Sequence, residues 1–201
     1  MGKYNNDGNK WNCRTYTMDS LQDDINLLTI YDLEKKLKEK FGRWAGYGLV
    51  FCFGTSLISR IIQAKTRQYD GEVVPSHVLM IAGNMVLEST TDVCTVNHKR
   101  IPSGVRCWRL EDWAANEKNR LTKYYYYETT RIDIDTATSL LHLPYGKDTI
   151  VDFLIKDKSE GDRTHGLICS QYANKCTQLS KQRCPSPADL FRIIKDLERG
   201  N

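Results

Sequence analysis

The sequence predicts an α+β protein in which an antiparallel sheet packs against helices. The first observation is a hairpin: residues 76–82 and 85–90 are strand-like and flank Gly83-Asn84, a favoured two-residue turn. The second is that segments with helical spacing of apolar residues lie before and after this hairpin, together with shorter strand-like runs. No internal repeat is visible, so we do not expect a repeat architecture.

Length and composition fit one globular domain, with or without a short arm. The 201 residues include 29 Lys+Arg and 25 Asp+Glu, and 40% are hydrophobic, which argues against a disordered chain. We expect a polar N-terminal arm over residues 1–18 and a single domain over residues 19–201. The longest uncharged run, residues 44–59, is shorter than the roughly 20 apolar residues of a membrane span, so no transmembrane segment is expected. No secretory leader is visible, which favours a cytoplasmic location.

Apolar spacing and turn residues predict the elements of the N-terminal half. A helix is expected from Asp19 or Ser20, which can cap it, to about Lys40. Gly42, Gly46 and Gly48 end this helix, and a short buried strand is expected over residues 49–53. A second helix follows over residues 56–68 and carries four apolar residues on one side: Leu57, Ile58, Ile61 and Ile62. A polar loop then leads into the hairpin.

After the hairpin, short strands and helices are predicted in turn. Strand-like segments occupy residues 93–96, 105–110 and 123–129, and a further apolar segment occupies residues 150–155. Helices are expected over residues 112–121, 133–141, 167–179 and 188–199. Ser186-Pro187 suits the first positions of the last helix, because proline fits the first helical turn.

The hairpin places two candidate catalytic groups near each other. With Gly83-Asn84 as the turn, Ala82 faces Met85, and Glu88 becomes the diagonal neighbour of His77 on the same face. Diagonal neighbours are about 7–8 Å apart, which a long side chain can span. A carboxylate beside an imidazole can fix its tautomer and stabilise its protonated form. The alternative is an ordinary polar edge of a hairpin.

A third candidate is Cys169, where an apolar stretch turns into a predicted helix. A thiol at a helix N-terminus lies at the positive end of the helix dipole, which lowers its pKa. Free N–H groups of the first helical turn can also bind an oxyanion. The alternative is a buried structural cysteine. His165, four residues earlier, is a rival to His77 as the base.

The seven cysteines are scattered and include no Cys-x-x-Cys pair. An odd number leaves at least one thiol unpaired within the chain. Short ligand spacings typical of zinc sites are absent, so we expect no metal and no cofactor. A net charge of +4 is mild, and nucleic-acid binding is not expected.

His77, Glu88 and Cys169-Ser170, in this order, resemble the circularly permuted papain-like cysteine hydrolases. These form the YiiX-like branch of the NlpC superfamily, which is related to the lecithin-retinol-acyltransferase-like proteins. The likeness spans roughly residues 46–195 and is supported by further short segments: 48–54, 56–62, 144–146 with 151–153, and 184–190. The resemblance implies a papain-like, permuted NlpC-type fold, with an antiparallel sheet packed against helices. Gln171 departs from it, since the family usually has an acidic residue after Cys-Ser.

The resemblance also implies roles. Cys169 would be the nucleophile, His77 the base and Glu88 the residue that orients His77. Tyr145 is a candidate substrate-facing group, and the alternative is an aromatic side chain packed for structure. The expected activity is a thiol hydrolase (peptidase or amidase) that cleaves an amide or isopeptide bond through an acyl-enzyme, on peptide-like substrates such as peptidoglycan-type peptides. Two alternatives stay open: a thiol acyltransferase or lipid hydrolase acting on an acyl substrate, and a non-catalytic binding or inhibitory protein on the same fold.

Overall fold

The computed structural model describes residues 25–96, 99–116, 122–146 and 166–200. It confirms the α+β class. Five strands form one antiparallel sheet in the order β6-β3-β2-β1-β7. Their bounds are β1 Gly46–Phe53, β2 His77–Gly83, β3 Met85–Thr90, β6 Gly104–Arg109 and β7 Lys123–Glu128. A separate two-stranded sheet pairs β4, Cys94–Val96, with β5, Lys99–Ile101, which the sequence did not predict as a strand.

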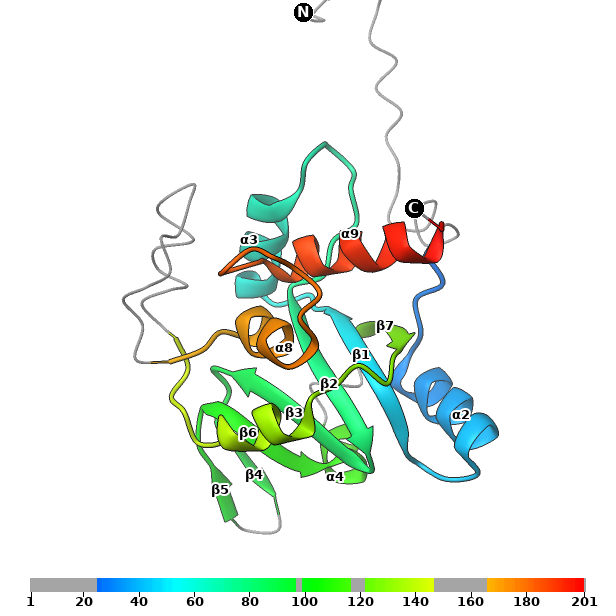
Figure 1. Cartoon of the computed structure of the whole chain (residues 1–201), viewed down its shortest axis with the longest axis vertical. Coiled ribbons are helices and arrows are strands. Elements are labelled where there is room, and N and C mark those ends of the chain that lie inside the picture. Colours follow the sequence, from blue (N-terminus) through cyan, green and yellow to red (C-terminus); the bar gives the residue numbers. More distant parts are fainter. Residues whose placement is uncertain (1–24, 97–98, 117–121, 147–165, 201) are drawn as a thin grey trace, which may run out of the picture.

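Six helices surround the sheet in the described part of the chain (Figure 1). Their bounds are α2 Ile30–Phe41, α3 Leu57–Thr66, α4 Leu110–Ala115, α6 Ile134–Ser139, α8 Cys169–Thr177 and α9 Pro187–Glu198. None of the described helices is long and apolar enough to cross a membrane.

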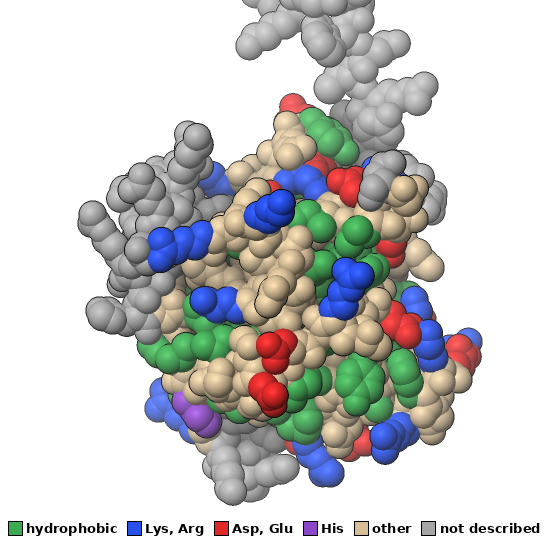
Figure 2. Space-filling view, in the orientation of Figure 1, with side chains coloured by type: hydrophobic (Ala, Val, Ile, Leu, Met, Phe, Trp, Pro, Cys, Tyr) green, Lys and Arg blue, Asp and Glu red, His purple; other side chains and the backbone are tan. Residues whose placement is uncertain are grey.

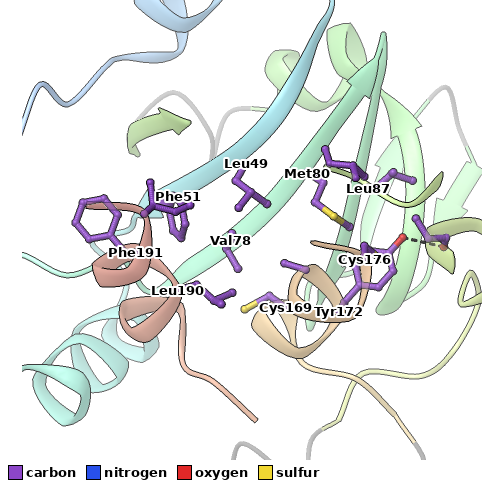
Figure 3. Packing of buried hydrophobic residues seen from close by; sticks show 14 of the residues in the cluster. Leu49, Phe51, Val78, Met80, Leu87, Cys169, Tyr172, Cys176, Leu190 and Phe191 are labelled. Carbon is purple, nitrogen blue, oxygen red and sulfur yellow. Dashed lines mark hydrogen bonds between the residues drawn. The ribbon is translucent and has the colours of Figure 1, made fainter. Parts of the chain in front are cut away.

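Alternate residues of the central strands face two different cores, as the period of two in a strand requires. Leu49 and Val78 pack with residues of α6, α8 and α9 in the first core, part of which is drawn in Figure 3. Val50 and Leu79 pack with residues of α2 and α4 in the second. The sheet is therefore covered by helices on both faces. Tyr124 and Tyr126 belong to the second core and Tyr125 to the first, so the strand predicted over residues 123–129 forms and is buried on both faces.

The predicted hairpin register is confirmed. Ala82 lies opposite Met85, and Ile81 opposite Val86. The turn glycine, Gly83, has a φ of 62°, the left-handed conformation that favours glycine. On its other side β2 pairs with β1 along its whole length, from Gly46–Gly83 to Cys52–His77.

The first predicted helix begins about ten residues later than expected. Thr29 caps α2 through Asp32, and each side chain accepts a hydrogen bond from the other residue's backbone N–H. Leu28 instead forms a β-bridge with Tyr124, so residues 25–29 are not helical. The sheet provides these backbone hydrogen bonds, which periodicity alone does not reveal. Residues 19–24 and the predicted arm, residues 1–18, lie outside the described residues.

Of two other predicted segments, one has different bounds in the structure and one lies outside the described residues. The helix expected over residues 112–121 begins at Leu110 and ends at Ala115, directly after β6, and residues 117–121 lie outside the described part. The apolar segment at residues 150–155 also lies outside it. The helices α3, α6, α8 and α9 agree with their predicted positions to within two residues at each end.

Candidate active site

Three separate segments of the chain meet at one end of the sheet. His77 is the first residue of β2, and Glu88 lies near the end of the antiparallel β3, so both belong to the same end. Cys169 is the first residue of α8, which packs on β2 and β3. Figure 3 shows Cys169 at the margin of the first core, where α8 begins. The structure thus brings together the three residues that the sequence singled out.

A buried carboxylate links His77 to an arginine. Glu88 Oε2 lies 3.2 Å from His77 Nε2, as the hairpin geometry predicted. Its other oxygen, Oε1, accepts hydrogen bonds from Arg106 Nε at 2.9 Å and Nη2 at 2.7 Å. Arg106 lies directly opposite Glu88 in β6 and also stacks 4.6 Å from the centre of the Trp108 ring. Glu88 and Arg106 are only 4% and 7% exposed, so the pair is held rigidly inside the protein.

The Cys169 sulfur receives support from the imidazole and from the backbone. The His77 ring hydrogen-bonds the thiol, and the backbone N–H groups of Val78 and Ser170 also donate to it. Since His77 Nε2 faces Glu88, we infer that Nδ1 is the nitrogen that serves Cys169. The N–H of Cys169 itself belongs to the first turn of α8, where backbone donors have no partner within the helix.

These contacts favour a charged pair. Burial lowers the pKa of His77, but the negative charges of Cys169 and Glu88 outweigh it and raise the pKa to about 10. Burial raises the pKa of Cys169, but the imidazolium and the backbone N–H groups outweigh it, so the pKa is lowered. The pKa of Glu88 is also lowered, because His77 and Arg106 overcome its burial. A thiolate beside an imidazolium is the state of an activated nucleophile.

Other described cysteines show the opposite effect. Burial raises the pKa of Cys107 and, to about 12, that of Cys176. Burial also raises the pKa of Cys52, and the charges of Glu88 and Cys169 raise it further. Cys52 lies opposite His77 in β1, yet its environment keeps it protonated. The lowered pKa therefore distinguishes Cys169 from these three thiols.

The segment before α8 is fixed on both sides. Ser89 Oγ of β3 donates a 2.5 Å hydrogen bond to the carbonyl of Leu167, and Tyr145 forms a parallel β-bridge with Leu167. A Cβ at Gly166 would lie 2.2 Å from the carbonyl oxygen of Pro144, so this close approach requires glycine. The nucleophile is thus placed by rigid contacts to the sheet and to the 144–146 segment.

Gln171 has a structural role at the helix start. Its Oε1 accepts a hydrogen bond from the backbone N–H of Ile168, the residue before the helix, at 3.1 Å. The contact completes one end of the helix that carries Cys169. A glutamate or aspartate at this position could accept the same hydrogen bond, so Gln171 keeps the helix cap although it is not acidic.

A pocket opens beside the thiol. It is small, with a volume of about 30 Å³, it is open to solvent, and its lining is mostly apolar. Tyr145 and Cys169 line it, as do Ile62 of α3 and two residues of the loop before α9, Cys184 and Pro185. Tyr145 thus lies where a substrate-facing residue is expected, although its contribution to binding stays a prediction.

Sequence reasoning missed Arg106 and most of the pocket wall. Two arginines, Arg106 and Arg109, interrupt the otherwise apolar segment 105–110, and this was a usable signal, because a charge that becomes buried needs a partner. Ile62 and Pro185 carried no such signal. His165, the rival base, lies outside the described residues.

The described residues show no group of three or more His, Cys, Asp or Glu side chains placed to hold a metal ion. On the face shown in Figure 2, Lys and Arg side chains are dispersed among acidic and hydrophobic ones. No protein-family model, curated protein or solved structure matches this chain. The function proposed below therefore rests on the geometry and chemistry of the site.

Proposed function

We propose that the protein is a cysteine hydrolase that cleaves an amide or isopeptide bond through a thiol acyl-enzyme. The observation that carries the proposal is the contact of Cys169 with His77, whose ring is held by Glu88, which Arg106 holds in turn. The antiparallel sheet with a cysteine-bearing helix on it is compatible with a permuted papain-like fold.

The residues support a two-step reaction. The Cys169 thiolate attacks the carbonyl carbon, the C–N bond breaks, and the amine leaves with a proton from His77. Water then attacks the thioester and gives a proton to His77, which releases the acid and regenerates the thiolate. Glu88 holds the imidazole in the required orientation. The N–H groups at the start of α8 are suited to bind the negative oxygen of each tetrahedral intermediate.

The first test is the reactivity of Cys169 toward iodoacetamide at mildly acidic pH, followed by peptide mass spectrometry. Ordinary thiols are protonated there, so Cys169 should be alkylated first, and His77→Ala should remove this selectivity. Cys176 lies in the same helix, is 1% exposed and provides the matched comparison. Equal and slow alkylation of the thiols would favour a non-catalytic protein.

The second test compares Cys169→Ala with Cys176→Ala on a panel of peptide amides and isopeptides. Only Cys169→Ala should abolish hydrolysis and the acyl-enzyme adduct seen by intact-protein mass spectrometry. Full hydrolysis by Cys169→Ala would exclude the proposed nucleophile.

A second candidate is a lipid hydrolase or thiol acyltransferase, which would use the same acyl-enzyme. The mostly apolar lining of the pocket, including Ile62, Ile168 and Pro185, favours it, because an acyl chain buries favourably against such side chains. Acyl-lipid substrates in the same panel separate the two candidates.

A further inference from the structure

The helix α3 exposes its apolar side to solvent. Leu57 is 74% exposed, Ile58 58% and Ile61 40%, so three of the ten exposed large hydrophobic residues of the described chain lie within one helix. The spacing of these residues places them on one side of the helix. The sequence predicted that these apolar residues share one side of the helix. An apolar stripe of this kind normally packs against a hydrophobic core, whereas this one is exposed to solvent.

Polar contacts explain how α3 stays in place with its apolar side outward. Thr66 is the buried residue of the helix, and its carbonyl accepts a 2.6 Å hydrogen bond from Arg192 Nη2 of α9. Arg192 is in turn paired with Glu72, and Gln63 Nε2 donates to the carbonyl of Gly54. Figure 1 shows α3 beside the first turns of α9. The helix is attached by its polar side and one end.

Positive charge accompanies the apolar stripe. Residues 54–69 contain Arg60, Lys65 and Arg67 and no acidic residue, and all three cations are exposed. An exposed aromatic ring, Tyr69 at 66%, follows directly. Apolar side chains flanked by lysine and arginine are typical of helices that lie in the headgroup region of an anionic bilayer.

The stripe is also continuous with the candidate active site. Ile62, next to Ile61 in α3, lines the pocket that contains Cys169. A surface that lies against α3 would therefore adjoin the mouth of the pocket. A lipid surface fits these features together, because it satisfies the apolar stripe, the cations and the apolar pocket lining at once.

We propose that the exposed face of α3, formed by Leu57, Ile58 and Ile61 with Arg60 and Arg67, docks the protein on an anionic lipid surface. Docking requires no catalysis, so it can be tested whether or not the thiol hydrolase proposal holds. In this arrangement acyl chains at the surface are the groups nearest to the pocket.

The test is sedimentation of the full chain with phosphatidylcholine vesicles that contain or lack phosphatidylserine. The wild type should sediment with the anionic vesicles, less with the neutral ones, and less at high salt. The variant Leu57→Gln/Ile58→Gln should weaken binding by roughly tenfold per side chain. Arg60→Gln/Arg67→Gln should weaken it by roughly fivefold per charge and reduce the salt dependence.

The matched control is Ile134→Gln/Leu197→Gln, since these side chains are exposed to 40% and 45% on other helices. It should bind vesicles like the wild type. The proposal is overturned if the wild type stays in the supernatant with anionic vesicles, or if both α3 variants sediment like it. It is also overturned if Leu57→Gln/Ile58→Gln converts a self-associated wild type to monomers, which would show that α3 binds a second copy.

Discussion

Replacing Glu88 with glutamine removes the charge that joins His77 and Arg106. The shape of the side chain is kept, but Arg106, only 7% exposed, loses the carboxylate to which its Nε and Nη2 donate. Breaking a buried ion pair from one side costs about 3–5 kcal/mol, because one charge is left buried and uncompensated. For a chain of this size each kcal/mol lowers Tm by about 2–4 °C, so Glu88→Gln should melt roughly 6–20 °C lower.

The same substitution should lower the reactivity of the Cys169 thiol. Without the Glu88 carboxylate the pKa of His77 falls, because one of the two negative groups that stabilise its proton is lost. The imidazolium that lowers the pKa of Cys169 is then less populated. Thermal unfolding followed by circular dichroism measures the stability, and the rate of Cys169 alkylation at pH about 6 measures the thiolate, since ordinary thiols with pKa about 8.5 are almost fully protonated there.

Two further variants separate these effects. Glu34→Gln removes the carboxylate from the exposed pair with Lys38 and should change stability by less than about 0.5 kcal/mol. Combining Glu88→Gln with Arg106→Met should recover much of the lost stability, because no buried charge is left without a partner. The rate of Cys169 alkylation should stay low in this double variant. If Glu88→Gln melts like the wild type, or alkylates Cys169 equally fast, the proposed coupling is wrong.

Three more outcomes follow from the structure. Gln171→Ala leaves the N–H of Ile168 without its acceptor and should cost about 1–3 kcal/mol in urea unfolding. Phe191→Ala removes a ring that contacts Phe51, Phe53 and Tyr125 edge-on at 5.2–5.5 Å between centroids, and should cost about 3–5 kcal/mol by the same assay without changing the selectivity of Cys169 alkylation. Hydrolysis should fall as pH rises through about 10, where His77 loses the proton that the leaving amine needs, whereas alkylation should not fall, since it needs only the thiolate.

Each of these outcomes has a direct check. Leu197→Ala, at a 45% exposed position of the same helix as Phe191, should leave stability nearly unchanged. A Gln171→Ala variant as stable as the wild type would show that the cap is not important. If alkylation and hydrolysis decline together above pH 10, the loss reflects unfolding rather than titration of His77.

Local sequence patterns predicted those parts of the candidate site that depend on a single turn or a single helix start. A two-residue turn fixes the hairpin register, and the register alone brings Glu88 within reach of His77. The change in apolar spacing predicted a helix from residue 167, which put Cys169 in its first turn, and α8 begins at Cys169 itself. By contrast, Arg106 could not be placed, because its position opposite Glu88 depends on the pairing of β3 with β6, a contact between segments that no turn connects.

The helices show the same limit. Apolar spacing correctly predicted α3 but could not tell whether its stripe faces a core or solvent, because both give the same period. It also placed the start of α2 too early, because Leu28 pairs with Tyr124 of a strand far along the chain.

The sequence by itself determined the α+β class, the hairpin and the three residues of the candidate site, since period, turns and helix starts are local properties. Only the tertiary structure decided that Cys169 meets His77, that Arg106 supports Glu88, and that the apolar side of α3 remains exposed beside the pocket. The physical reason is that pKa values and burial depend on which distant segments pack together. Those contacts form only when the whole chain has folded.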